Sequence, residues 1–567
     1  MTNKEVAEVL EEIAVLLELS GENPFKARAY VNVARTLEQC PEEIETLVRG
    51  KRLREIKGVG DALEKKLTEL VTSGTLKYHE DLRAKFPDSL FELFKIPGLG
   101  AKRIKALYAD LGIASLAELD AACRADRLSG VKGFGKKTQE NILEGIAFAH
   151  EHVGQFLANA ATEEAERLRD YLRNDPAVTR IEIAGSIRRC KEIVKDIDIL
   201  VATKRPQAIM ERFINAEGVA SVTAHGDTKS SVVLESGIAA DLRAVSDAQF
   251  PYALHYFTGS KAHNVALRQR AKAKGLKLNE YGLFRGSKNV PCADEAAIYA
   301  QLDLPYIPPE LREDMGEFEA ESLPGLVDMD DLTGMFHCHS TYSDGKASIE
   351  AMAKACKKLG YRYLVLADHS QSAAYAGGLT PDAVAKQHAE IEALNKRLKG
   401  FRVIKGIESD IRKNGALDYE PDILSQFEFV FAAIHSHLTM QEAEATARVV
   451  KAIESPLTDV LAHPSGRLLL EREGYPLDMD KVFDACLANH VAIEINASPQ
   501  RLDLDWRYIR RAKDKGIKFC IGPDAHSVEG LGKMRYGVGV ARKGWLEPGD
   551  LLNGMTAQEL AKWRRSS

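Results

Sequence analysis

Alternating apolar and polar positions predict two β-strands between residues 180 and 201. The first strand runs to Ile183, Gly185-Ser186 interrupts the pattern, and the second strand begins at Asp196. On the second strand Asp196 and Asp198 share one face, roughly 6–7 Å apart, while isoleucines line the other face. Two carboxylates this close raise each other's pKa unless a cation lies between them, and a divalent, oxygen-preferring ion fits there. For a D-x-D pattern alone, the solvent-exposed face of an edge strand is the alternative.

A later strand adds a third carboxylate, and the Gly-Ser turn adds candidate phosphate ligands. Asp241 and Arg243 share one face of a short apolar strand, so Asp241 could complete a two-metal site for phosphoryl transfer. Gly185-Ser186 leads into a helical turn whose free N–H groups suit a phosphate. The following Arg188-Arg189 adds fork-shaped donors for phosphate oxygens.

Apolar residues at helical spacing predict helices over the first 80 residues, and a glycine motif recurs three times from residue 53 onwards. The copies read L-R-E-I-K-G-V-G-D-A-L-E-K-K-L from residue 53, F-K-I-P-G-L-G-A-K-R-I-K-A-L from residue 94 and S-G-V-K-G-F-G-K-K-T-Q-E-N-I-L from residue 129. Their glycines are Gly58, Gly60, Gly98, Gly100, Gly133 and Gly135. Each pair predicts a tight turn before a helix N-terminus, where N–H groups can contact a phosphate. Glycine C-caps between packed helices are the alternative, and three copies followed by lysines count against it.

From Gly334 onwards, strand-like apolar runs alternate with helical ones, as in a repeating β/α fold. Histidines and carboxylates follow those strands, where a β/α barrel presents its active groups. The nine candidate metal ligands are His337, His339, Asp344, His369, Glu408, His435, His463, Asp524 and His526. Mixed imidazole and carboxylate ligands suit zinc, manganese or iron. We treat His437, Asp368 and Asp410 as supporting or incidental neighbours.

Composition favours a globular intracellular protein. The 567 residues suffice for three to five domains, and the net charge of −6 is no general sign of nucleic-acid binding. Between Lys261 and Lys288, however, there are eight basic residues and one acid, Glu280. The eight cysteines form no C-x-x-C pair, the N-terminus has no apolar signal core, and no stretch approaches 18 apolar residues. We therefore expect a cytoplasmic protein, associated with the nucleoid when on DNA, that binds no membrane.

The pattern G-S-x-R-R-(x6)-D-x-D with a later D-L-R resembles the nucleotidyltransferase palm of family X DNA polymerases. By this resemblance the ligands of two Mg²⁺ or Mn²⁺ ions are Asp196, Asp198 and Asp241, and the triphosphate ligands are Gly185, Ser186 and Arg189. Asp241 would join the metal that activates the primer 3′-OH. Such palms often carry an arginine just upstream, and F-L-A-N-A-A from Phe156 has none. Triphosphate binding would therefore rest more on Arg189.

The sequence Y-F-T-G-S-K-A-H-N-V-A-L-R from Tyr256, followed by K-L-N-E-Y-G-L-F from Lys277, is similar to the thumb region of the same family. The resemblance implies that Tyr256, Phe257 and Gly259 line the incoming sugar, that Asn264 reads the minor-groove edge, that Arg268 contacts the template strand, and that Arg243 contacts DNA. A basic helix over 268–277 would hold template phosphates. Lys261 departs from relatives that carry an acid there. A basic amphipathic surface helix is the alternative.

The three glycine motifs resemble helix-hairpin-helix motifs, which hold the DNA backbone without reading sequence. The resemblance also implies a monovalent cation at their turns. In the first copy, Lys66 aligns with the lysine that family X lyase domains use as a Schiff-base nucleophile against a 5′-deoxyribose phosphate, and Lys26 and Tyr30 fall at supporting positions. Ala62 and Phe25 stand where that pattern has a lysine and a histidine. For Lys66, a solvated helix lysine is the interpretation that we favour.

The C-terminal block resembles the PHP (polymerase and histidinol phosphatase) domain, a distorted β/α barrel with a trinuclear metal site. The resemblance covers residues 334–567, and all nine ligand positions of the active pattern are filled. It implies up to three Mn²⁺, Zn²⁺ or Fe²⁺ ions, which would turn bound water into hydroxide. The implied activity is a 3′→5′ exonuclease that could also cut at abasic sites.

Together these patterns predict a multidomain protein of α+β and α/β class. We expect helical helix-hairpin-helix N-terminal domains, a nucleotidyltransferase palm and thumb, and a C-terminal distorted β/α barrel. The predicted boundaries are a lyase-like domain at 1–82, a fingers-like helical domain at 83–150, the palm at 151–245, the thumb at 246–310, a linker at 311–333 and the PHP domain at 334–567. The stretch 305–333 around the linker is rich in acids and contains four helix-breaking prolines, Pro305, Pro308, Pro309 and Pro324.

The first functional hypothesis is a template-directed repair polymerase, acting as a monomer on gapped or primer-template DNA with deoxynucleoside triphosphates, and fused to an exonuclease. A second hypothesis makes the chain chiefly a phosphoesterase whose polymerase half has decayed. The three aspartates and the intact Y-F-T-G-S count against decay. A third hypothesis is a DNA-end-binding scaffold that uses the glycine motifs, and two complete sets of candidate metal ligands count against it.

Overall fold

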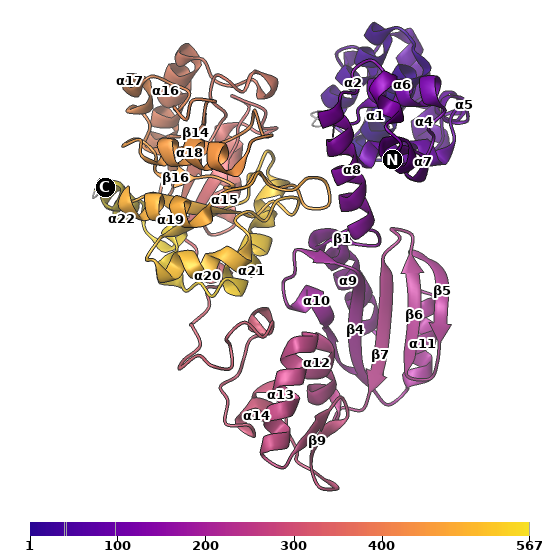
Figure 1. The fold of residues 1–567 in the computed structure, drawn as a ribbon, viewed down its shortest axis with the longest axis vertical. Coiled ribbons are helices and arrows are strands. Elements are labelled where there is room, and N and C mark those ends of the chain that lie inside the picture. The colour runs from indigo at the N-terminus through magenta and orange to yellow at the C-terminus, as the bar shows by residue number, and fades with distance from the viewer. Residues whose placement is uncertain (39, 41, 97, 566–567) are drawn as a thin grey trace. The chain divides into compact units, whose positions relative to one another are not determined.

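The structure is a computed structural model that describes residues 1–38, 40, 42–96 and 98–565. The chain divides into two compact units, Met1–Val153 and Gly154–Ser567 (Figure 1). Pro97, within the second glycine motif, lies outside the described residues. No helix in the described ranges combines the length and apolar character needed to cross a membrane.

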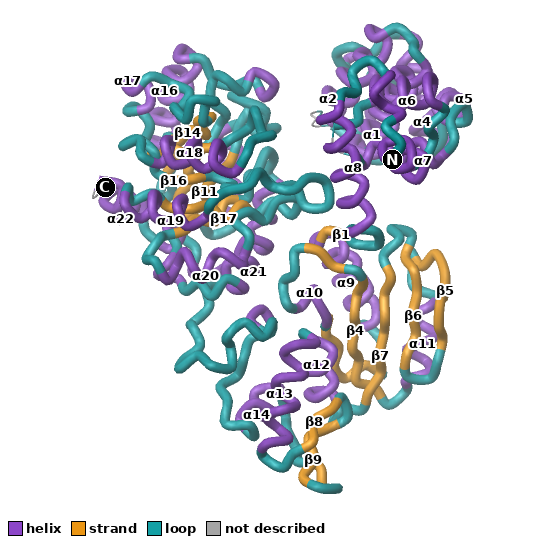
Figure 2. The backbone as a smooth tube through the Cα atoms, in the orientation of Figure 1, coloured by secondary structure: helices purple, strands orange, loops and turns teal. Residues whose placement is uncertain are grey.

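The first unit is helical, and Figure 2 shows its helices joined by short loops. Its helices are α1 (Asn3–Ser20), α2 (Pro24–Glu38), α3 (Ile44–Arg49), α4 (Asp61–Ser73), α5 (Lys77–Arg83), α6 (Ala101–Leu111), α7 (Leu116–Arg124) and α8 (Lys136–Glu151). The predicted apolar face of the first helix is confirmed, because Val6, Leu10 and Ile13 are fully buried. Two hydrophobic clusters form, one around α1–α4 and one around α6–α8.

The three glycine motifs adopt the same turn. In each copy the N–H between the two glycines donates to the carbonyl three residues back: Val59 to Ile56 at 3.1 Å, Leu99 to Ile96 at 3.0 Å and Phe134 to Val131 at 3.1 Å. The first glycine of each pair has a φ between 81° and 96°. The second glycine caps the N-terminus of α4, α6 or α8. The motif therefore places a helix N-terminus directly after each turn, as predicted.

The second unit begins with the palm, a mixed sheet in the order β2-β4-β7-β6-β5. Its elements are β1 (Phe156–Leu157), α9 (Ala158–Arg173), β2 (Val178–Ile183), α10 (Gly185–Arg188), β3 (Ile193–Val194), β4 (Asp196–Thr203), α11 (Pro206–Ile214), β5 (Val219–His225), β6 (Lys229–Leu234) and β7 (Ala239–Val245). Strands β4 and β7 are parallel, and the other pairs of the sheet are antiparallel. Helix α9 packs its apolar face on the sheet.

The thumb follows as helices around a small three-stranded sheet. Its elements are α12 (Phe250–Thr258), α13 (Lys261–Ala273), β8 (Lys277–Asn279), β9 (Gly282–Arg285), β10 (Lys288–Asn289) and α14 (Glu295–Ala300). The basic helix starts and ends earlier than predicted: α13 ends at Ala273, and Lys277 already belongs to β8. Gly275, with φ 70°, adopts the left-handed conformation that interrupts the helix.

The C-terminal part is a β/α barrel built from parallel strands. Its elements are β11 (Gly334–Cys338), α15 (Ile349–Lys358), β12 (Tyr363–Leu366), α16 (Pro381–Arg397), β13 (Arg402–Ile404), β14 (Gly406–Asp410), α17 (Pro421–Leu424), β15 (Phe429–Ala433), α18 (Glu442–Ile453), β16 (Val460–Leu461), α19 (Met479–Ala488), β17 (Ala492–Asn496), α20 (Trp506–Asp514), β18 (Phe519–Gly522), α21 (Met534–Lys543) and α22 (Ala557–Arg565). The bridge between Cys338 and Ala525 closes the ring, and β13 and β14 are two halves of one strand position broken at Lys405.

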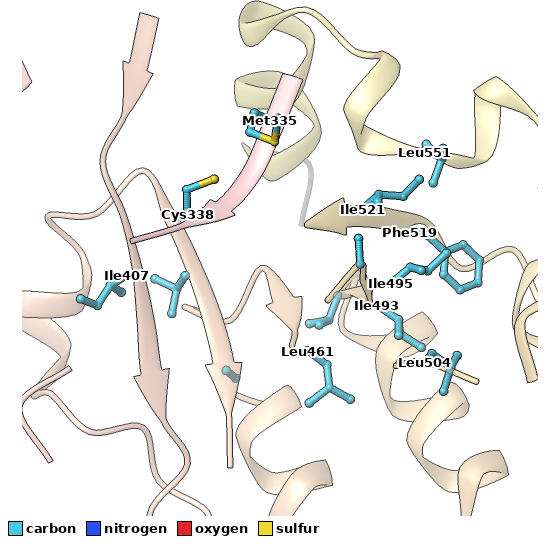
Figure 3. Packing of buried hydrophobic residues seen from close by; sticks show 14 of the residues in the cluster. Met335, Cys338, Ile407, Leu461, Ile493, Ile495, Leu504, Phe519, Ile521 and Leu551 are labelled. Carbon is cyan, nitrogen blue, oxygen red and sulfur yellow. The ribbon is translucent and has the colours of Figure 1, made fainter. Parts of the chain in front are cut away.

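Both faces of the barrel strands are buried. On β15, Phe429 and Phe431 belong to one hydrophobic cluster, whereas Val430 and Ala432 belong to another. This period of two separates an inner cluster from an outer one that packs on the helices. Figure 3 shows part of the outer cluster, with side chains such as Ile493 lying along neighbouring strands. The predicted fold class, helical domains followed by a palm, a thumb and a distorted β/α barrel, is confirmed.

Candidate active sites

Three carboxylates meet on adjacent palm strands. Strands β4 and β7 pair in the register Asp198 to Asp241, and Asp196 lies two residues before Asp198 on the same face. Asp241 accepts a hydrogen bond from the Ser231 hydroxyl at 2.6 Å and pairs with Lys229 at 2.7 Å. The parallel pairing therefore brings together residues more than forty positions apart in the sequence.

These carboxylates perturb one another. Burial, followed by the charges of Asp196 and Asp241, raises the pKa of Asp198 to about 6. Burial and the charge of Asp241 likewise raise the pKa of Asp196. Gly185 lies against this cluster, because a Cβ atom added there would come within 2.3 Å of Asp198 Oδ2. Charges held this close suit a divalent cation, and their oxygen ligands match Mg²⁺ or Mn²⁺.

The candidate triphosphate ligands Gly185 and Ser186 lie in the short helix α10, and Arg189 follows it. Arg189 is largely buried, and its Nη1 donates to the Thr258 carbonyl at 2.5 Å, so it contacts the Y-F-T-G-S segment directly. Arg188 is occupied within the protein, because it donates to Glu295 at 2.6 Å.

The predicted thumb residues cluster at the end of α12 and the start of α13. The rings of Tyr256 and Phe257 meet edge to face, with centroids 5.2 Å apart. Asn264 Nδ2 donates to the Tyr256 carbonyl at 2.7 Å, and Arg268 Nε donates to the Asn264 carbonyl at 3.2 Å. The Arg243 guanidinium stacks over the Phe257 ring at 4.3 Å, which links palm and thumb. The same stretch carries Gly259, with φ 70°.

Lys66 is not a freely solvated lysine. Its Nζ donates to the Tyr30 hydroxyl at 2.5 Å and lies 3.2 Å from the centroid of the Tyr78 ring. Burial, followed by the charge of Lys26, lowers the pKa of Lys66 to about 8. The side chain is therefore partly neutral near physiological pH. The two departures from the lyase pattern, Phe25 and Ala62, lie on α2 and α4, the helices that carry Tyr30 and Lys66.

All nine predicted ligands of the barrel converge at the carboxyl ends of the strands. Their ligand atoms form four overlapping groups, each with its atoms within 4.8 Å of one another: His339, Asp344, His369 and His526; His337, Glu408 and His463; His337, His339 and Asp524; His369, Glu408 and His435. Glu408 lies at the centre, since its carboxylate is 2.8 Å from His463 Nε2, 2.9 Å from His369 Nδ1 and 3.1 Å from His435 Nε2. Because the groups share members, these residues would hold more than one divalent ion between them.

Buried polar atoms in this cluster lack partners that a metal would supply. Within the described part of the chain, His337 Nε2, His339 Nδ1 and Glu408 Oε2 are buried and accept or donate no hydrogen bond. Burial would raise the pKa of Glu408, but the charges of His435 and His369 hold it well below its usual range. The donor set therefore fits divalent metal ions.

Backbone strain is concentrated at the same place. His337, His463 and Asp524 have φ angles of 51°, 25° and 50°, in the left-handed region that non-glycine residues rarely adopt. Such conformations cost about 1–3 kcal/mol each and persist where the surroundings impose them. Three of the nine predicted ligands are held in this way, as expected for side chains aimed at a common point.

Glu494, on β17, is a residue that the sequence analysis missed. Its Oε1 accepts from His337 Nδ1 at 2.5 Å, and its Oε2 accepts from the His463 backbone N–H at 2.7 Å. It fixes which nitrogen of His337 faces the cluster. Asp410 does the same for His435, through Nδ1 at 2.5 Å. The signal for Glu494 was present in the sequence, because a glutamate between two isoleucines of a fully buried strand needs a partner.

Of the residues set aside in the sequence analysis, Asp368 takes a structural position. Its carboxylate is buried and accepts hydrogen bonds from Ser340, Ser343 and Gln387. His437 is exposed, and in the described ranges its side chain joins none of the four ligand groups.

Known protein families match the chain along most of its length. Family models match residues 1–76 (helix-hairpin-helix domain), 90–147 (SAM-like helix-hairpin-helix tandem), 253–313 (DNA polymerase beta thumb) and 336–498 (PHP domain). The protein of Bacillus subtilis (strain 168) named "DNA polymerase/3'-5' exonuclease PolX" is 38% identical over 568 residues, which cover 99% of this chain and 99% of that protein. The chain belongs to the PolX family of family X DNA polymerases.

Other relatives of this PolX-family chain match its C-terminal part. A "Probable phosphatase" of Thermoanaerobacter sp. (strain X514) is 26% identical over 230 residues, which cover 38% of this chain and 88% of that protein. Another, from Shewanella sp. (strain ANA-3), is 28% identical over 206 residues, covering 35% of this chain and 74% of that protein. The match to the Bacillus subtilis protein covers both the polymerase part and the barrel of this chain. The comparisons therefore give no support to a decayed polymerase half or to a DNA-end-binding scaffold.

Proposed function

We propose that this chain adds deoxynucleotides to the 3′ end of a primer in short DNA gaps during repair, and that its C-terminal barrel removes nucleotides from 3′ ends. The observation that carries the proposal is the pairing of Asp198 with Asp241 across β4 and β7, with Asp196 on the same face. These carboxylates would hold two Mg²⁺ or Mn²⁺ ions. When bound, the ions would neutralise triphosphate charge and favour ionisation of the primer 3′-OH.

The chain's own groups would position the substrates. Gly185 and Ser186 would offer backbone N–H groups to the triphosphate, and Arg189 would offer guanidinium N–H groups. The packed rings of Tyr256 and Phe257 would limit the room for a ribose 2′-OH. Asn264 and Arg268 are close enough to each other to contact adjoining parts of the new base pair and the template.

The helix-hairpin-helix turns would grip the DNA backbone on either side of the gap. Each turn ends in a glycine that caps a helix, at Gly60, Gly100 and Gly135. A Cβ atom built at any of the three would meet no atom within 4 Å, so a phosphate can approach the N–H groups closely. A monovalent cation would fit the carbonyls of the same turns.

The barrel site would hold up to three Mn²⁺, Zn²⁺ or Fe²⁺ ions between its nine ligands, and such ions supply hydroxide at neutral pH. Burial and the neighbouring His526 and His369 lower the pKa of His339 to about 3, so this imidazole stays neutral and can ligate. Glu494 and Asp410 would orient His337 and His435 toward the ions.

Paired substitutions test the assignment of the two sites. Asp198→Ala should lower primer extension on gapped DNA by at least about 100-fold, because a metal ligand is lost, and leave manganese-dependent 3′ digestion unchanged. His339→Ala should do the reverse. The measurement is extension and degradation of a labelled primer, with and without nucleotides, in magnesium and in manganese.

Each variant serves as the control for the other, since both keep one site intact. Normal extension by Asp198→Ala would show that the palm is misassigned. Normal digestion by His339→Ala would remove the barrel as the nuclease.

We further propose that Lys66 removes a 5′-deoxyribose phosphate. Its neutral amine would attack the sugar aldehyde and expel water to form an iminium. Loss of a proton from the adjacent carbon would then eliminate the phosphate and free the DNA 5′ end, and hydrolysis of the iminium would return the amine. The half-buried position of Lys66 and its contact with Tyr30 support this role.

A further inference from the structure

The segment that joins thumb and barrel is held by the polymerase side of the second unit. We call residues 310–317 the strap. The Ser260 N–H, in the Y-F-T-G-S segment, donates to the Arg312 carbonyl at 3.0 Å. The fully buried Arg312 guanidinium pairs with Glu295 at 2.5 Å. The predicted linker therefore packs directly against the proposed nucleotide site.

The barrel holds the same strap through helix α21. Arg542 Nε donates to Glu310 Oε1 at 2.7 Å. Lys543 Nζ donates to Glu313 Oε1 at 2.6 Å, to the Glu310 carbonyl at 3.2 Å and to the Arg189 carbonyl at 3.1 Å. The Lys543 side chain is completely buried, and these three acceptors match the three N–H groups of an ammonium. A barrel residue thus contacts Arg189 directly.

Glu313 stands between two cations. The oxygen that pairs with Lys543 also accepts from Arg189 Nε at 3.1 Å. Arg189 Nη1 donates to the Thr258 carbonyl at 2.5 Å. Among the described residues, Nη2 of Arg189 has no hydrogen-bond partner, so one edge of the guanidinium is left for a ligand.

We propose that Lys543 is a positioning residue of the polymerase nucleotide site. Its ammonium group neutralises the charge of Glu313 and donates to the Arg189 carbonyl. The Arg189 guanidinium is thereby kept available to the incoming triphosphate. The inference rests on the proposed function of Arg189. Two cations and one anion leave this trio with a net charge of +1. Without Lys543 the net charge of the remaining pair, Arg189 and Glu313, is zero, and the Glu313 carboxylate competes with phosphate for the Arg189 guanidinium. Burial strengthens the effect, because water screens these charges poorly.

Single-nucleotide insertion on gapped DNA, measured over a range of nucleotide concentrations, tests the inference. Lys543→Met should raise the nucleotide KM by about tenfold, the size expected for one charge-assisted contact, with a smaller change in kcat. Adding Glu313→Gln to Lys543→Met restores a net charge of +1 and should return the KM toward its wild-type value. A merely structural role predicts that the second substitution makes insertion worse, which would overturn the proposal.

Controls separate this inference from the proposed function. Lys533→Met removes a lysine at the N-cap of α21, for which no ion pair with the strap occurs in the described ranges, and should leave the KM unchanged. Exonuclease rates should be unchanged in every variant. If Asp198→Ala is inactive and Lys543→Met keeps the wild-type KM, the inference alone is wrong. If Asp198→Ala still extends primers, the proposed function itself fails.

A conservative variant covers loss of folding. Should Lys543→Met lose exonuclease activity as well, Lys543→Arg keeps the charge in place. A wild-type KM in Lys543→Arg together with a raised one in Lys543→Met supports the proposal, whereas a raised KM in both, at equal thermal midpoints, contradicts it.

Discussion

In both candidate sites, single residues have an unfavourable charge environment or an unfavourable backbone conformation. Asp198 has its pKa raised to about 6 by burial and by two neighbouring carboxylates, and His337 keeps a left-handed backbone. Both conditions cost stability in the protein without ions. A bound divalent cation would offset the carboxylate repulsion, so the same residues that weaken the free protein create affinity for the ion.

Lys66 gives a prediction that depends on pH. Because the pKa of Lys66 is lowered to about 8, its neutral fraction rises between pH 7 and pH 8.5, whereas an ordinary lysine would stay protonated there. Borohydride trapping of the chain on DNA with a 5′-deoxyribose phosphate should therefore rise about eightfold from pH 7 to pH 8.5 and level off above that, whereas trapping by an ordinary lysine would keep rising about tenfold per pH unit. Gel analysis of the trapped complex measures it.

The matched control is Lys65, which is exposed and directly precedes Lys66. Lys65→Ala should trap normally, and Lys66→Ala should not trap. Equal trapping by both variants would mean that another amine reacts.

Residues that belong to a sequence motif could be predicted from the sequence. Residues whose role depends on a contact with a distant residue could not. The nine barrel ligands follow strand ends, and their convergence could be predicted. Glu494, Glu313 and Lys543 carry no motif, and each matters because a distant residue contacts it: His337 and Lys543 lie 157 and 230 positions from their carboxylate partners. Such contacts depend on tertiary packing, which a single sequence does not specify.

At the scale of elements, the turn from β2 through α10 into β4 sets how closely the backbone approaches the candidate metal-binding carboxylates of the palm. Gly185 has φ 63°, and its missing side chain leaves room for Asp198. The Ala184 N–H donates to the Asp198 carbonyl at 2.8 Å, which ties the turn to the strand. The residue before the short helix is therefore fixed to the strand that carries Asp198.

Gly185→Ala should lower primer extension by about 10- to 100-fold, because the new methyl group would come within 2.3 Å of Asp198 Oδ2 and displace that carboxylate. Exonuclease activity should persist. The measurement is the extension rate at saturating nucleotide.

Gly286→Ala controls for backbone strain. Gly286 has a similar φ of 61°, and a Cβ atom there would meet nothing within 4 Å. Equal losses in both variants would attribute the effect to left-handed backbone alone and refute the contact with Asp198.

Element types were predictable where apolar periodicity was strong, as in α1 and the palm strands. The end of α13 was misplaced because basic residues run on past Ala273 into β8, and charge carries no information about backbone conformation. The left-handed Gly275 was the local signal that the charge pattern concealed.

At the scale of the whole molecule, binding of divalent metal ions and stability should be coupled in one unit only. The candidate ligands all lie in Gly154–Ser567, and the unit Met1–Val153 has its own hydrophobic clusters. Ions present at 1,000 times their dissociation constant stabilise the binding unit by about 4 kcal/mol. Chelation should therefore lower one thermal transition in calorimetry and leave the other unmoved.

His339→Ala should make the metal-dependent transition less sensitive to the chelator, because one ligand shared by two groups is lost. A chelator that shifts both transitions equally, or neither in the wild-type chain, would contradict this division.

The contacts that cross from barrel to palm bear on how the two activities can be separated. Glu192 accepts from the Trp506 indole at 3.1 Å, and Glu313 and Glu310 face Lys543 and Arg542. Deleting residues 334–567 would remove the indole that donates to Glu192, the Arg542 partner of Glu310 and the Lys543 partner of Glu313, and it would expose the palm and strap surface that the barrel covers. A truncated enzyme would then report the damage of the cut as well as the loss of the nuclease. Although the chain is built from separate domain types, it is not modular at this boundary, and point substitutions dissect it more faithfully than deletion.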